Sequence, residues 1–375
     1  MLPEDFWSSA SCYIAVNPLR PAEEEGVTAY AANQGWQALC FFQTSGSEGK
    51  PKWVALSKDA LLTSANAVNT HFAVTAADRW LIALPLHHVG GFSILARSHL
   101  SGSTFVQDTQ RWQPHSFAQL CVSASITLVS LVPPQVHDLV RKKIPCPPNL
   151  RAAIIGGGGM SAELASAALG LGWPVYQSYG MTEAATQIAT ESYPRNTAGF
   201  DETRLEILPH WQLRTDPAGQ LLICGKALAK GYLTRANAGQ WCWEEIGGTL
   251  KTRDSVKLWH DGQRQFLHFI GRESGFVKIL GELIHLAPLQ ARLESLALKT
   301  GSLSMPIIVA RPDARRGAKL VLVTEDEHGP HLLTTFNDMT EPLCRLAGLI
   351  QLENIPRTDL GKVDSVALQL ALGTL

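Results

Sequence analysis

The chain lacks the sequence features of three classes of protein. Its seven cysteines include no Cys-x-x-Cys pair and are odd in number, which argues against a disulfide framework or a thiolate zinc site. It has neither a basic signal sequence nor an apolar run long enough to cross a bilayer. The net charge of −1 provides no basic face for nucleic acid. We therefore expect a cytoplasmic protein with reduced thiols, no membrane span and no nucleic-acid partner.

The chain does have enough apolar sequence for more than one core. It has 375 residues, of which 45% are hydrophobic and 17% are charged, and chains of this length usually divide into domains. A short polar break at residues 271–275 separates two parts with different patterns. We expect a large N-terminal domain at residues 1–271, a hinge at 272–274 and a small C-terminal domain at 275–375.

Strands and helices alternate through the first half of the chain, which is typical of parallel βαβ units. Ser57 is expected to cap a helix that ends near residue 71, and Ser161 to cap another. The other expected elements are strands at 81–84, 126–132, 152–155, 174–177, 205–208, 220–224, 276–280, 306–310 and 319–324, and helices at 287–298 and 335–347. Residues 1–37 are expected to be irregular. The predicted fold class is α/β, followed by a small α+β domain.

Residues 44–52 form the most informative segment, because they are small, hydroxylated and glycine-rich and end in lysines around a proline. Free backbone N–H groups, hydroxyls and ammonium groups together suit a polyphosphate. The G-x-x-x-x-G-K-[ST] phosphate loop is excluded by Thr44 and Pro51, and Ser161 breaks a dinucleotide motif at the later glycine run. The alternative to a phosphate cradle is a plain surface turn.

Six segments, taken in their order along the chain, indicate one class of enzyme more specifically than residues 44–52 alone. They are Thr44 to Lys52, Pro85 to Gly91, Tyr179 to Glu183, Lys251 to Asp254, Gly271-Arg272 with Lys278 and Gly281-Glu282, and Pro356 to Asp364. Together they resemble the adenylate-forming superfamily of acyl-CoA synthetases, luciferases and peptide-synthetase adenylation domains. The resemblance implies the adenylate-forming enzyme fold, in which a small C-terminal domain moves on a hinge at Ser274. We expect the large domain to be shortened at its N-terminus.

Three segments, one of which is not among these six, narrow the resemblance to one family of ligases. Residues 87–91, 130–135 and 178–187 resemble the o-succinylbenzoate–CoA ligases of menaquinone and phylloquinone synthesis. The resemblance implies an AMP-forming acid–thiol ligase that uses ATP, Mg²⁺ and coenzyme A with a small aromatic carboxylic acid. Such an enzyme must supply donors and cations to oxygens that gain negative charge.

The resemblance also implies roles for individual residues. Lys362 would bridge the carboxylate and the α-phosphate, with Thr182 and His88 as further catalytic residues. The implied ATP-binding residues are Thr44, Ser45, Gly46, Ser47, Gly49, Lys52, Gly157, Gly158, Tyr179, Gly180, Met181, Thr182, Asp254 and Arg272. The implied acyl-binding residues are His88, Gly180 and Gln187, and the implied coenzyme A tunnel includes Lys278 and Gly281. Glu183 would hold Mg²⁺.

Several alternatives stay open. His87 and His88 are expected to point apart on an extended chain, which argues against a zinc site made from the pair. Three substitutions depart from the superfamily pattern, namely Glu48, Arg253 and Leu280. Another acyl- or aryl-CoA ligase with the same mechanism, or a non-catalytic nucleotide-binding relative, would also fit the six segments.

Overall fold

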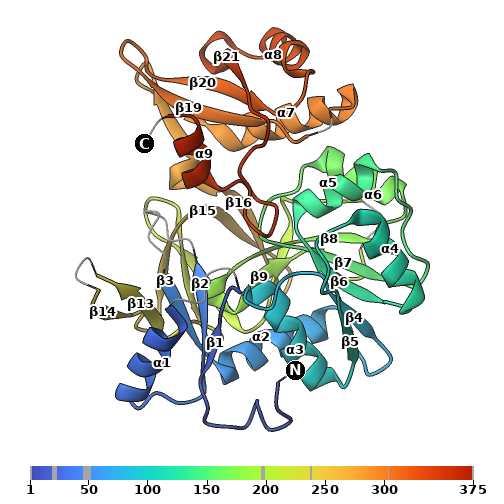
Figure 1. Cartoon of the computed structure of the whole chain (residues 1–375), viewed down its shortest axis with the longest axis vertical. Coiled ribbons are helices and arrows are strands. Elements are labelled where there is room, and N and C mark those ends of the chain that lie inside the picture. The colour runs from blue at the N-terminus through green and yellow to red at the C-terminus, as the bar shows by residue number, and fades with distance from the viewer. Residues whose placement is uncertain are drawn as a thin grey trace.

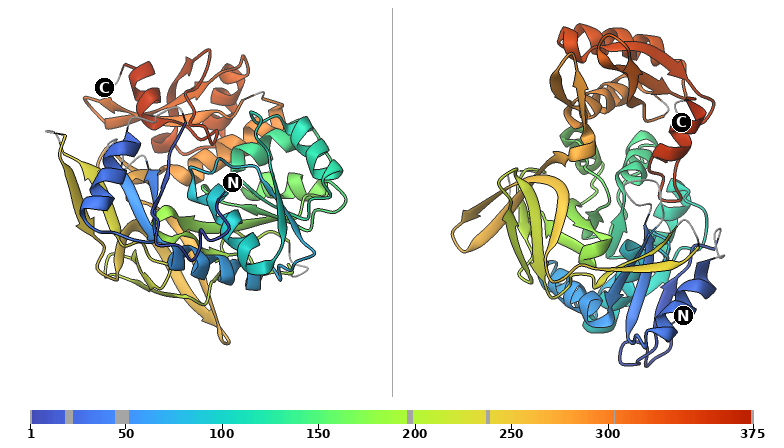
Figure 2. Two further views of the ribbon diagram at one scale, coloured as in Figure 1. Left: turned by 60° about the horizontal axis from the view of Figure 1, so that its bottom comes forward. Right: turned by 90° about the vertical axis from the view of Figure 1, so that its left-hand side faces the viewer.

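The computed structural model describes residues 2–18, 23–44, 52–195, 199–236, 239–302 and 304–373. Figure 1 shows a large lower unit, which contains the blue and green parts of the chain, and a small upper unit in orange and red. The right-hand view of Figure 2 shows the same units from the side, one above the other. Within the described residues the strands form four sheets, two in each unit.

One half of the largest sheet is parallel. Its described strands, in spatial order, are β5 (Thr104–Gln107), β4 (Arg79–Ile82), β6 (Leu128–Leu131), β7 (Ala152–Ile155) and β8 (Val175–Met181). The helices between them are α3 (Val89–Ser101), α4 (Pro114–Ser123), α5 (Pro133–Arg141) and α6 (Ala162–Gly170). The predicted α/β class with parallel βαβ units is confirmed. Loops that follow β6, β7 and β8 therefore meet at one edge of the sheet.

The other half of this sheet is antiparallel, as expected for the strands after residue 205. Its strands are β9 (Thr186–Thr190), β10 (Leu205–Ile207), β16 (Arg264–Arg272), β15 (Leu250–Asp261), β12 (Gln220–Gly225) and β11 (Trp211–Thr215). The expected end of β8 at residue 177 is wrong, because Ser178 to Met181 pair with β9 in antiparallel register. The ladder provides partners for backbone groups that the sequence alone assigns to a loop.

A second sheet forms the base of the large unit. It contains β1 (Tyr13–Ala15), β2 (Leu39–Thr44), β3 (Lys52–Ser57), β13 (Gly231–Arg235) and β14 (Trp241–Glu245), with α1 (Glu24–Asn33) and α2 (Lys58–His71) beside it. Ser57 caps α2 as predicted, since its Oγ accepts from Ala60 N at 3.1 Å. The expectation that residues 1–37 are irregular is wrong. β1 pairs with β2, and α1 buries Val27 and Ala31.

The small unit contains the described strands and α-helices that follow residue 275. These are β17 (Phe276–Ile279), β18 (Glu282–His285), α7 (Leu286–Thr300), β19 (Ile307–Asp313), β20 (Gly317–Thr324), α8 (Gly329–Asp338), β21 (Leu346–Gln351) and α9 (Ser365–Ala371). The predicted helix at 335–347 is wrong, because α8 ends at Asp338 and β21 begins at Leu346. The Asn337 side chain accepts from Leu346 N at 2.8 Å and donates to Leu346 O at 3.0 Å, which stops the helix and anchors the strand.

The buried apolar side chains follow the same division. The largest cluster includes Phe42, Trp80 and Leu267 and draws on residues before 272, whereas the cluster around Ile279 and Leu322 draws on residues after 276. Separate cores are typical of separate domains, so the boundary at 272–274 stays a prediction with this support. None of the described helices is long and apolar enough to cross a membrane.

Candidate active site

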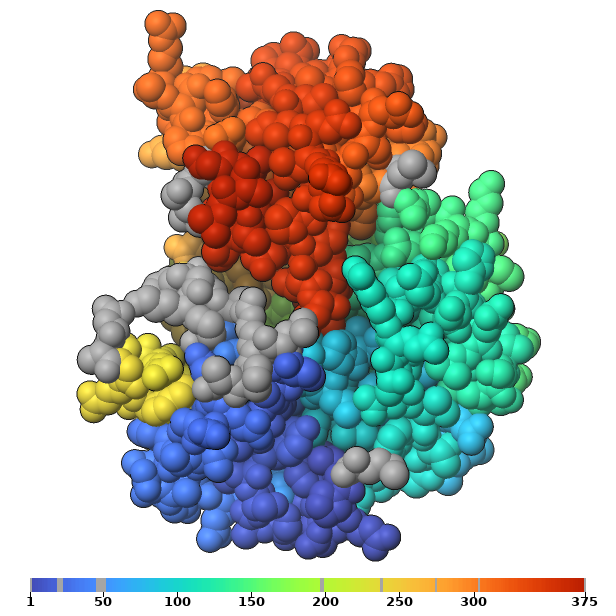
Figure 3. All heavy atoms as spheres, viewed as in Figure 1, coloured from blue at the N-terminus to red at the C-terminus, as the bar shows by residue number. Residues whose placement is uncertain are grey.

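A hairpin of the small unit faces the loops at the carboxyl ends of β6 and β7. A bridge between Arg357 and Val363 closes the hairpin. At its tip Gly361 N donates to Thr358 O at 2.8 Å, and Thr358 N donates to Lys362 O at 2.7 Å. Figure 3 shows the red tip of the small unit set against the teal part of the large unit. The turn therefore holds Lys362 in a fixed orientation at the junction of the two units.

The Lys362 ammonium lies over the glycine run that follows β7. A Cβ atom at Gly157 would come within 2.7 Å of Lys362 Nζ and 3.0 Å of its Cε. Gly157 also has φ +74°, in the left-handed region that favours glycine. Burial, with a contribution from Arg272, lowers the pKa of Lys362. An anion bound at this point would favour the charged amine and reverse that effect.

Asp254 is the centre of a polar cluster on the antiparallel side of the sheet. It is 1% exposed and accepts hydrogen bonds from Tyr179 Oη at 2.7 Å and from Arg272 Nε at 2.6 Å. Burial, followed by the nearby Asp254, raises the pKa of Tyr179 well above its usual value. One face of the Tyr179 ring stacks on Phe269 at 5.5 Å between centroids. Three of the predicted ATP-binding residues, Tyr179, Asp254 and Arg272, are thus joined directly.

A second cluster surrounds Glu183. Lys52 Nζ and Tyr232 Oη each donate to Glu183 Oε1 at 3.1 Å. The Lys52 ammonium also lies 3.7 Å from the centroid of the Tyr232 ring, a cation–π contact. Both of these hydrogen bonds reach Oε1, so that a metal ion held by Glu183 would meet Oε2 clear of these two donors. One carboxylate beside a polyphosphate fits the ligand set that Mg²⁺ prefers.

The predicted phosphate-binding segment is described only at its two ends. Thr44 ends β2 and Lys52 begins β3, and the Thr44 hydroxyl donates to Lys52 O at 3.5 Å. Four predicted members lie outside the described residues, namely Ser45, Gly46, Ser47 and Gly49. Glu48, one of the departures from the superfamily pattern, lies there as well.

The end of β8 carries three of the predicted residues into the space between the clusters. Gly180 and Met181 are its last two residues, and Thr182 begins a 3₁₀ turn, Thr182–Ala184. Gly158 follows β7, and its carbonyl accepts from Gln177 Nε2 at 3.0 Å. These strand and turn contacts bring residues near 157 and 182 to the same edge of the sheet.

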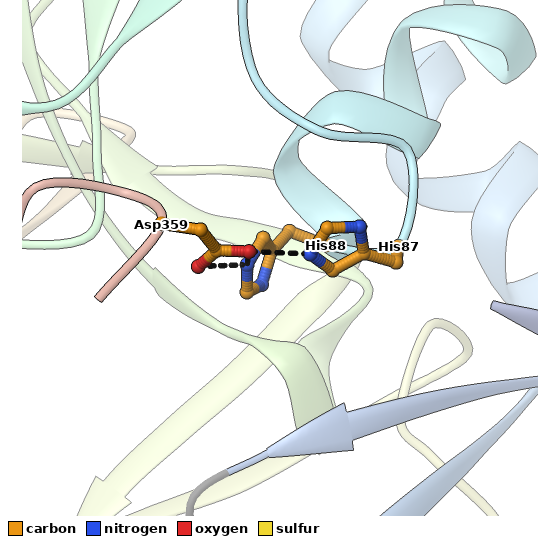
Figure 4. Close-up of side chains that lie close together, drawn as sticks. All are labelled: His87, His88 and Asp359. Atoms are coloured by element: carbon orange, nitrogen blue, oxygen red, sulfur yellow. Dashed lines mark hydrogen bonds and ion pairs between the residues drawn. The ribbon is translucent and has the colours of Figure 1, made fainter. Parts of the chain in front are cut away.

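His87 and His88 lie between β4 and α3 and both reach the hairpin of the small unit. His87 Nε2 donates to Asp359 Oδ2 at 2.5 Å, and His88 Nε2 donates to Oδ1 at 3.0 Å and to Oδ2 at 3.1 Å. The expectation that the two side chains point apart is wrong, because the chain turns just before His88, where His88 N donates to Pro85 O at 3.1 Å, and both rings converge on one carboxylate (Figure 4). The predicted role of His88 along the acyl path stays a prediction.

Several buried polar side chains of the large unit have an atom without a hydrogen-bond partner among the described residues. They include Gln187 with its Oε1, in β9, and Arg97 with its Nε, in α3. Arg97 donates to Ser130 Oγ at 3.3 Å and packs over the Trp80 ring. Burial lowers the pKa of Arg97 to about 9. A buried cation of this kind is stabilised by an anion.

The predicted coenzyme A residues lie on the small unit, away from Lys362. Lys278 and Gly281 line a surface groove of about 410 Å³ together with Leu280, Arg315, Arg316 and Gly317. Leu280 has φ +51°, which costs a side chain about 1–2 kcal/mol. Ser274, the predicted hinge, lies in the 3₁₀ turn Glu273–Gly275 between β16 and β17. These residues are not brought to the Lys362 site.

The site therefore consists of three linked groups around the end of β8: Lys362 on Gly157, the Asp254 cluster and the Glu183 cluster. Sequence reasoning missed Tyr232, Phe269 and Asp359. The contact of Tyr232 with Glu183 depends on the pairing of β13 with β3, which no local sequence pattern reports. Asp359 lies inside a segment that was identified, but its partners come from a remote loop.

Comparisons with known proteins identify the family of this chain. The profile of the family described as AMP-binding enzyme matches residues 7–233. The chain is 31% identical over 286 residues to the 2-succinylbenzoate–CoA ligase of Bacillus subtilis strain 168, covering 73% of this chain and 56% of that protein. The chain thus spans little more than half the length of this curated relative.

Solved structures give the same result for the fold. An o-succinylbenzoate CoA synthetase from Bacillus subtilis, in complex with the acyl-adenylate intermediate OSB-AMP, is similar with a TM-score of 0.69 and 27% identity over 89% of this chain and 68% of that chain. The enzyme of that name from the same organism in complex with ATP and a magnesium ion also gives 0.69, with 27% identity over 88% and 69%. Because the family profile covers more than half of its length, this chain belongs to the AMP-binding enzyme family.

Proposed function

We propose that this chain activates o-succinylbenzoate with ATP and then transfers the acyl group to coenzyme A, as a cytoplasmic step of menaquinone or phylloquinone synthesis. The acid and ATP give an acyl-adenylate and pyrophosphate. The thiol of coenzyme A then displaces AMP, which leaves the thioester and a proton. All seven cysteines are free, which fits a reducing compartment.

The observation that carries this proposal is the position of Lys362 over Gly157. Both the attacking carboxylate and the α-phosphate are negatively charged, and their approach needs a cation between them. The hairpin presents the Lys362 ammonium at the edge of the sheet where the Asp254 and Glu183 clusters begin. Asp254 would accept from the ribose hydroxyls and Tyr179 would cover the adenine, with Arg272 holding Asp254 in place.

Glu183 is the residue that would hold Mg²⁺, together with phosphate oxygens. The ion supplies positive charge to the phosphates when it is bound. Lys52 contacts Glu183 directly. It can therefore move its hydrogen bond to a phosphate when the nucleotide arrives.

Arg97 favours an acid with two carboxylates. o-Succinylbenzoate keeps one carboxylate after the other is activated, and that group would pair with the Arg97 guanidinium. A monocarboxylic aromatic or fatty acid would leave the buried cation without this partner. If so, Arg97→Lys should weaken activity toward o-succinylbenzoate more than toward benzoate.

The test is ATP–pyrophosphate exchange with a panel of acids. Exchange with o-succinylbenzoate in preference to benzoate and to fatty acids is the expected result. Preference for another acid would replace the substrate assignment by a different acyl- or aryl-CoA ligase. Tight ATP binding without exchange for any acid would make the chain a non-catalytic nucleotide-binding relative.

A further inference from the structure

One carboxylate of the small unit is held by two imidazole rings of the large unit. The Asp359 side chain is 27% exposed, and those of His87 and His88 are 13% and 28% exposed. Both histidines direct Nε2 at the carboxylate, at 2.5 to 3.1 Å (Figure 4). Because a carboxylate oxygen is the acceptor in each case, each Nε2 must carry a hydrogen.

Asp359 and Lys362 belong to the same tight turn, so fixing one fixes the other. The turn is closed by the hydrogen bonds between Thr358 and Gly361 and between Thr358 and Lys362. A Cβ atom at Gly361 would lie 3.5 Å from Pro134 Cβ at the start of α5. The turn thus touches the large unit on both sides of the point where Lys362 enters the site.

We propose that His87, His88 and Asp359 form an interdomain latch that seats Lys362 over the nucleotide site, so that Asp359 and His87 are positioning residues for acyl-adenylate formation. The proposal rests on the function proposed above. In physical terms, the latch sets the fraction of molecules in which the hairpin is docked against the large unit. Release of the latch would free the small unit for the second step.

The geometry favours direct hydrogen bonds over a bridging metal ion. A zinc-type ion would lie about 2.0–2.1 Å from each Nε2, and the nearest carboxylate oxygen already lies 2.5 Å from His87 Nε2 along that direction. The carboxylate would have to withdraw to make room for the ion. A direct contact needs no such movement.

The charge on Asp359 gives the latch its strength. Hydrogen bonds from His87 and then His88 hold the pKa of Asp359 well below its usual range, so the carboxylate is ionised throughout the neutral pH range. Hydrogen bonds to an ionised group are among the stronger ones in proteins. Loss of this acceptor is expected to raise the undocked fraction by roughly tenfold or more.

The test measures how fast an N-hydroxysuccinimide ester acylates the Lys362 amine in the full chain, read by peptide mass spectrometry. Asp359→Ala and His87→Ala should each speed this labelling by roughly tenfold. The matched control is Asp338→Ala, which removes an exposed carboxylate from the end of α8 in the same unit. Unchanged labelling of Lys362 in both latch variants would overturn the proposal.

A double variant separates a shared contact from two independent effects. His87→Ala combined with Asp359→Ala should label Lys362 no faster than the faster single variant, because the two residues act through one hydrogen bond. Additive effects would contradict the latch. If Zn²⁺ slows labelling of the wild-type chain and a chelator reverses this, the cluster is a metal site and the latch assignment is wrong.

Measurements of enzymatic activity distinguish an error in the latch proposal from an error in the proposed function. Asp359→Ala should lower kcat for pyrophosphate exchange in proportion to the docked fraction that is lost, and leave the conversion of supplied acyl-adenylate to thioester unchanged. Asp359→Glu, which keeps the carboxylate, should restore part of the exchange rate. A wild-type chain without exchange would refute the function, while the labelling experiment would still decide the latch.

Discussion

At the scale of single residues, the site depends on Gly157, which has no side chain and so leaves room for Lys362. The Lys362 ammonium occupies the volume that a Cβ atom at Gly157 would need. The sequence identified the glycine run and Lys362 separately. It could not identify their contact, because positions 157 and 362 are 205 residues apart in the sequence.

The first prediction concerns Gly157→Ala. The new methyl group should displace Lys362 Nζ, and the φ of +74° should add strain. Pyrophosphate exchange should fall by roughly 10²–10³, the usual effect of losing one transition-state donor. Gly159→Ala is the control, since nothing lies within 4 Å of its Cβ position. Equal activity of the two variants would mean that Lys362 does not act from this position.

The second prediction concerns Tyr232→Phe. Removing the hydroxyl deletes one of the donors that orient Glu183. The Mg²⁺ concentration needed for half-maximal exchange should rise by roughly tenfold, as for other residues that orient a metal ligand. Tyr30→Phe, a change in α1, should leave this concentration unchanged. An unaltered Mg²⁺ requirement in Tyr232→Phe would remove Glu183 from the metal site.

At the scale of elements, the start of α3 determines where His87 and His88 lie.

The strands and helices with strong local signals were predicted correctly, such as α2 with its Ser57 cap and β7. The secondary-structure predictions were wrong where the conformation of a segment depends on its contact with another part of the chain. β8 is extended by pairing with β9, β1 forms only against β2, and β21 follows a helix that Asn337 terminates.

The third prediction concerns the start of α3. A Cβ atom at Gly91 would lie 2.4 Å from Leu84 O, so Gly91→Ala forces the helix away from the end of β4. The free energy of unfolding should fall by about 1–3 kcal/mol. At Gly90 the nearest atom is the flexible Leu84 Cδ1 at 3.4 Å, and alanine there should be neutral or stabilise by up to about 1 kcal/mol. Chemical denaturation of both variants measures the difference, and equal stabilities would show that α3 tolerates displacement.

At the scale of the whole molecule, buried histidines couple folding to pH. Burial lowers the pKa of His137, in α5, to about 4. Between about pH 4 and its unfolded value of about 6.5, the unfolded chain therefore binds more protons at His137 than the folded chain. The contribution of His137 to stability is present above this window and is lost as the pH falls through it.

The fourth prediction follows from this loss of stability at low pH. The free energy of unfolding of the wild-type chain should fall more steeply from pH 6.5 to 4 than that of His137→Gln. The difference in slope should be up to about 1.4 kcal/mol per pH unit. Denaturant unfolding at several pH values measures it, with the exposed His260→Gln as control. Parallel curves for wild type and His137→Gln would contradict the assigned burial.

The arrangement of the two units is the property that the sequence predicted least directly. Motif order predicted which segments form the site, and in the described structure Lys362 reaches Gly157, Tyr179 reaches Asp254 and Lys52 reaches Glu183. The predicted coenzyme A residues, such as Lys278, line a different surface. If each of the two proposed steps uses its own set of residues, the small unit must change how it docks between them.

The most direct measurement of this account is a pair of half-reactions on Lys362→Ala. ATP–pyrophosphate exchange reports acyl-adenylate formation, and conversion of supplied acyl-adenylate with coenzyme A reports thioester formation. We expect the substitution to abolish exchange and to leave the second half-reaction largely intact. An equal loss of both would show that Lys362 does not serve the first step alone, and the assignment of its docked position to adenylation would be wrong.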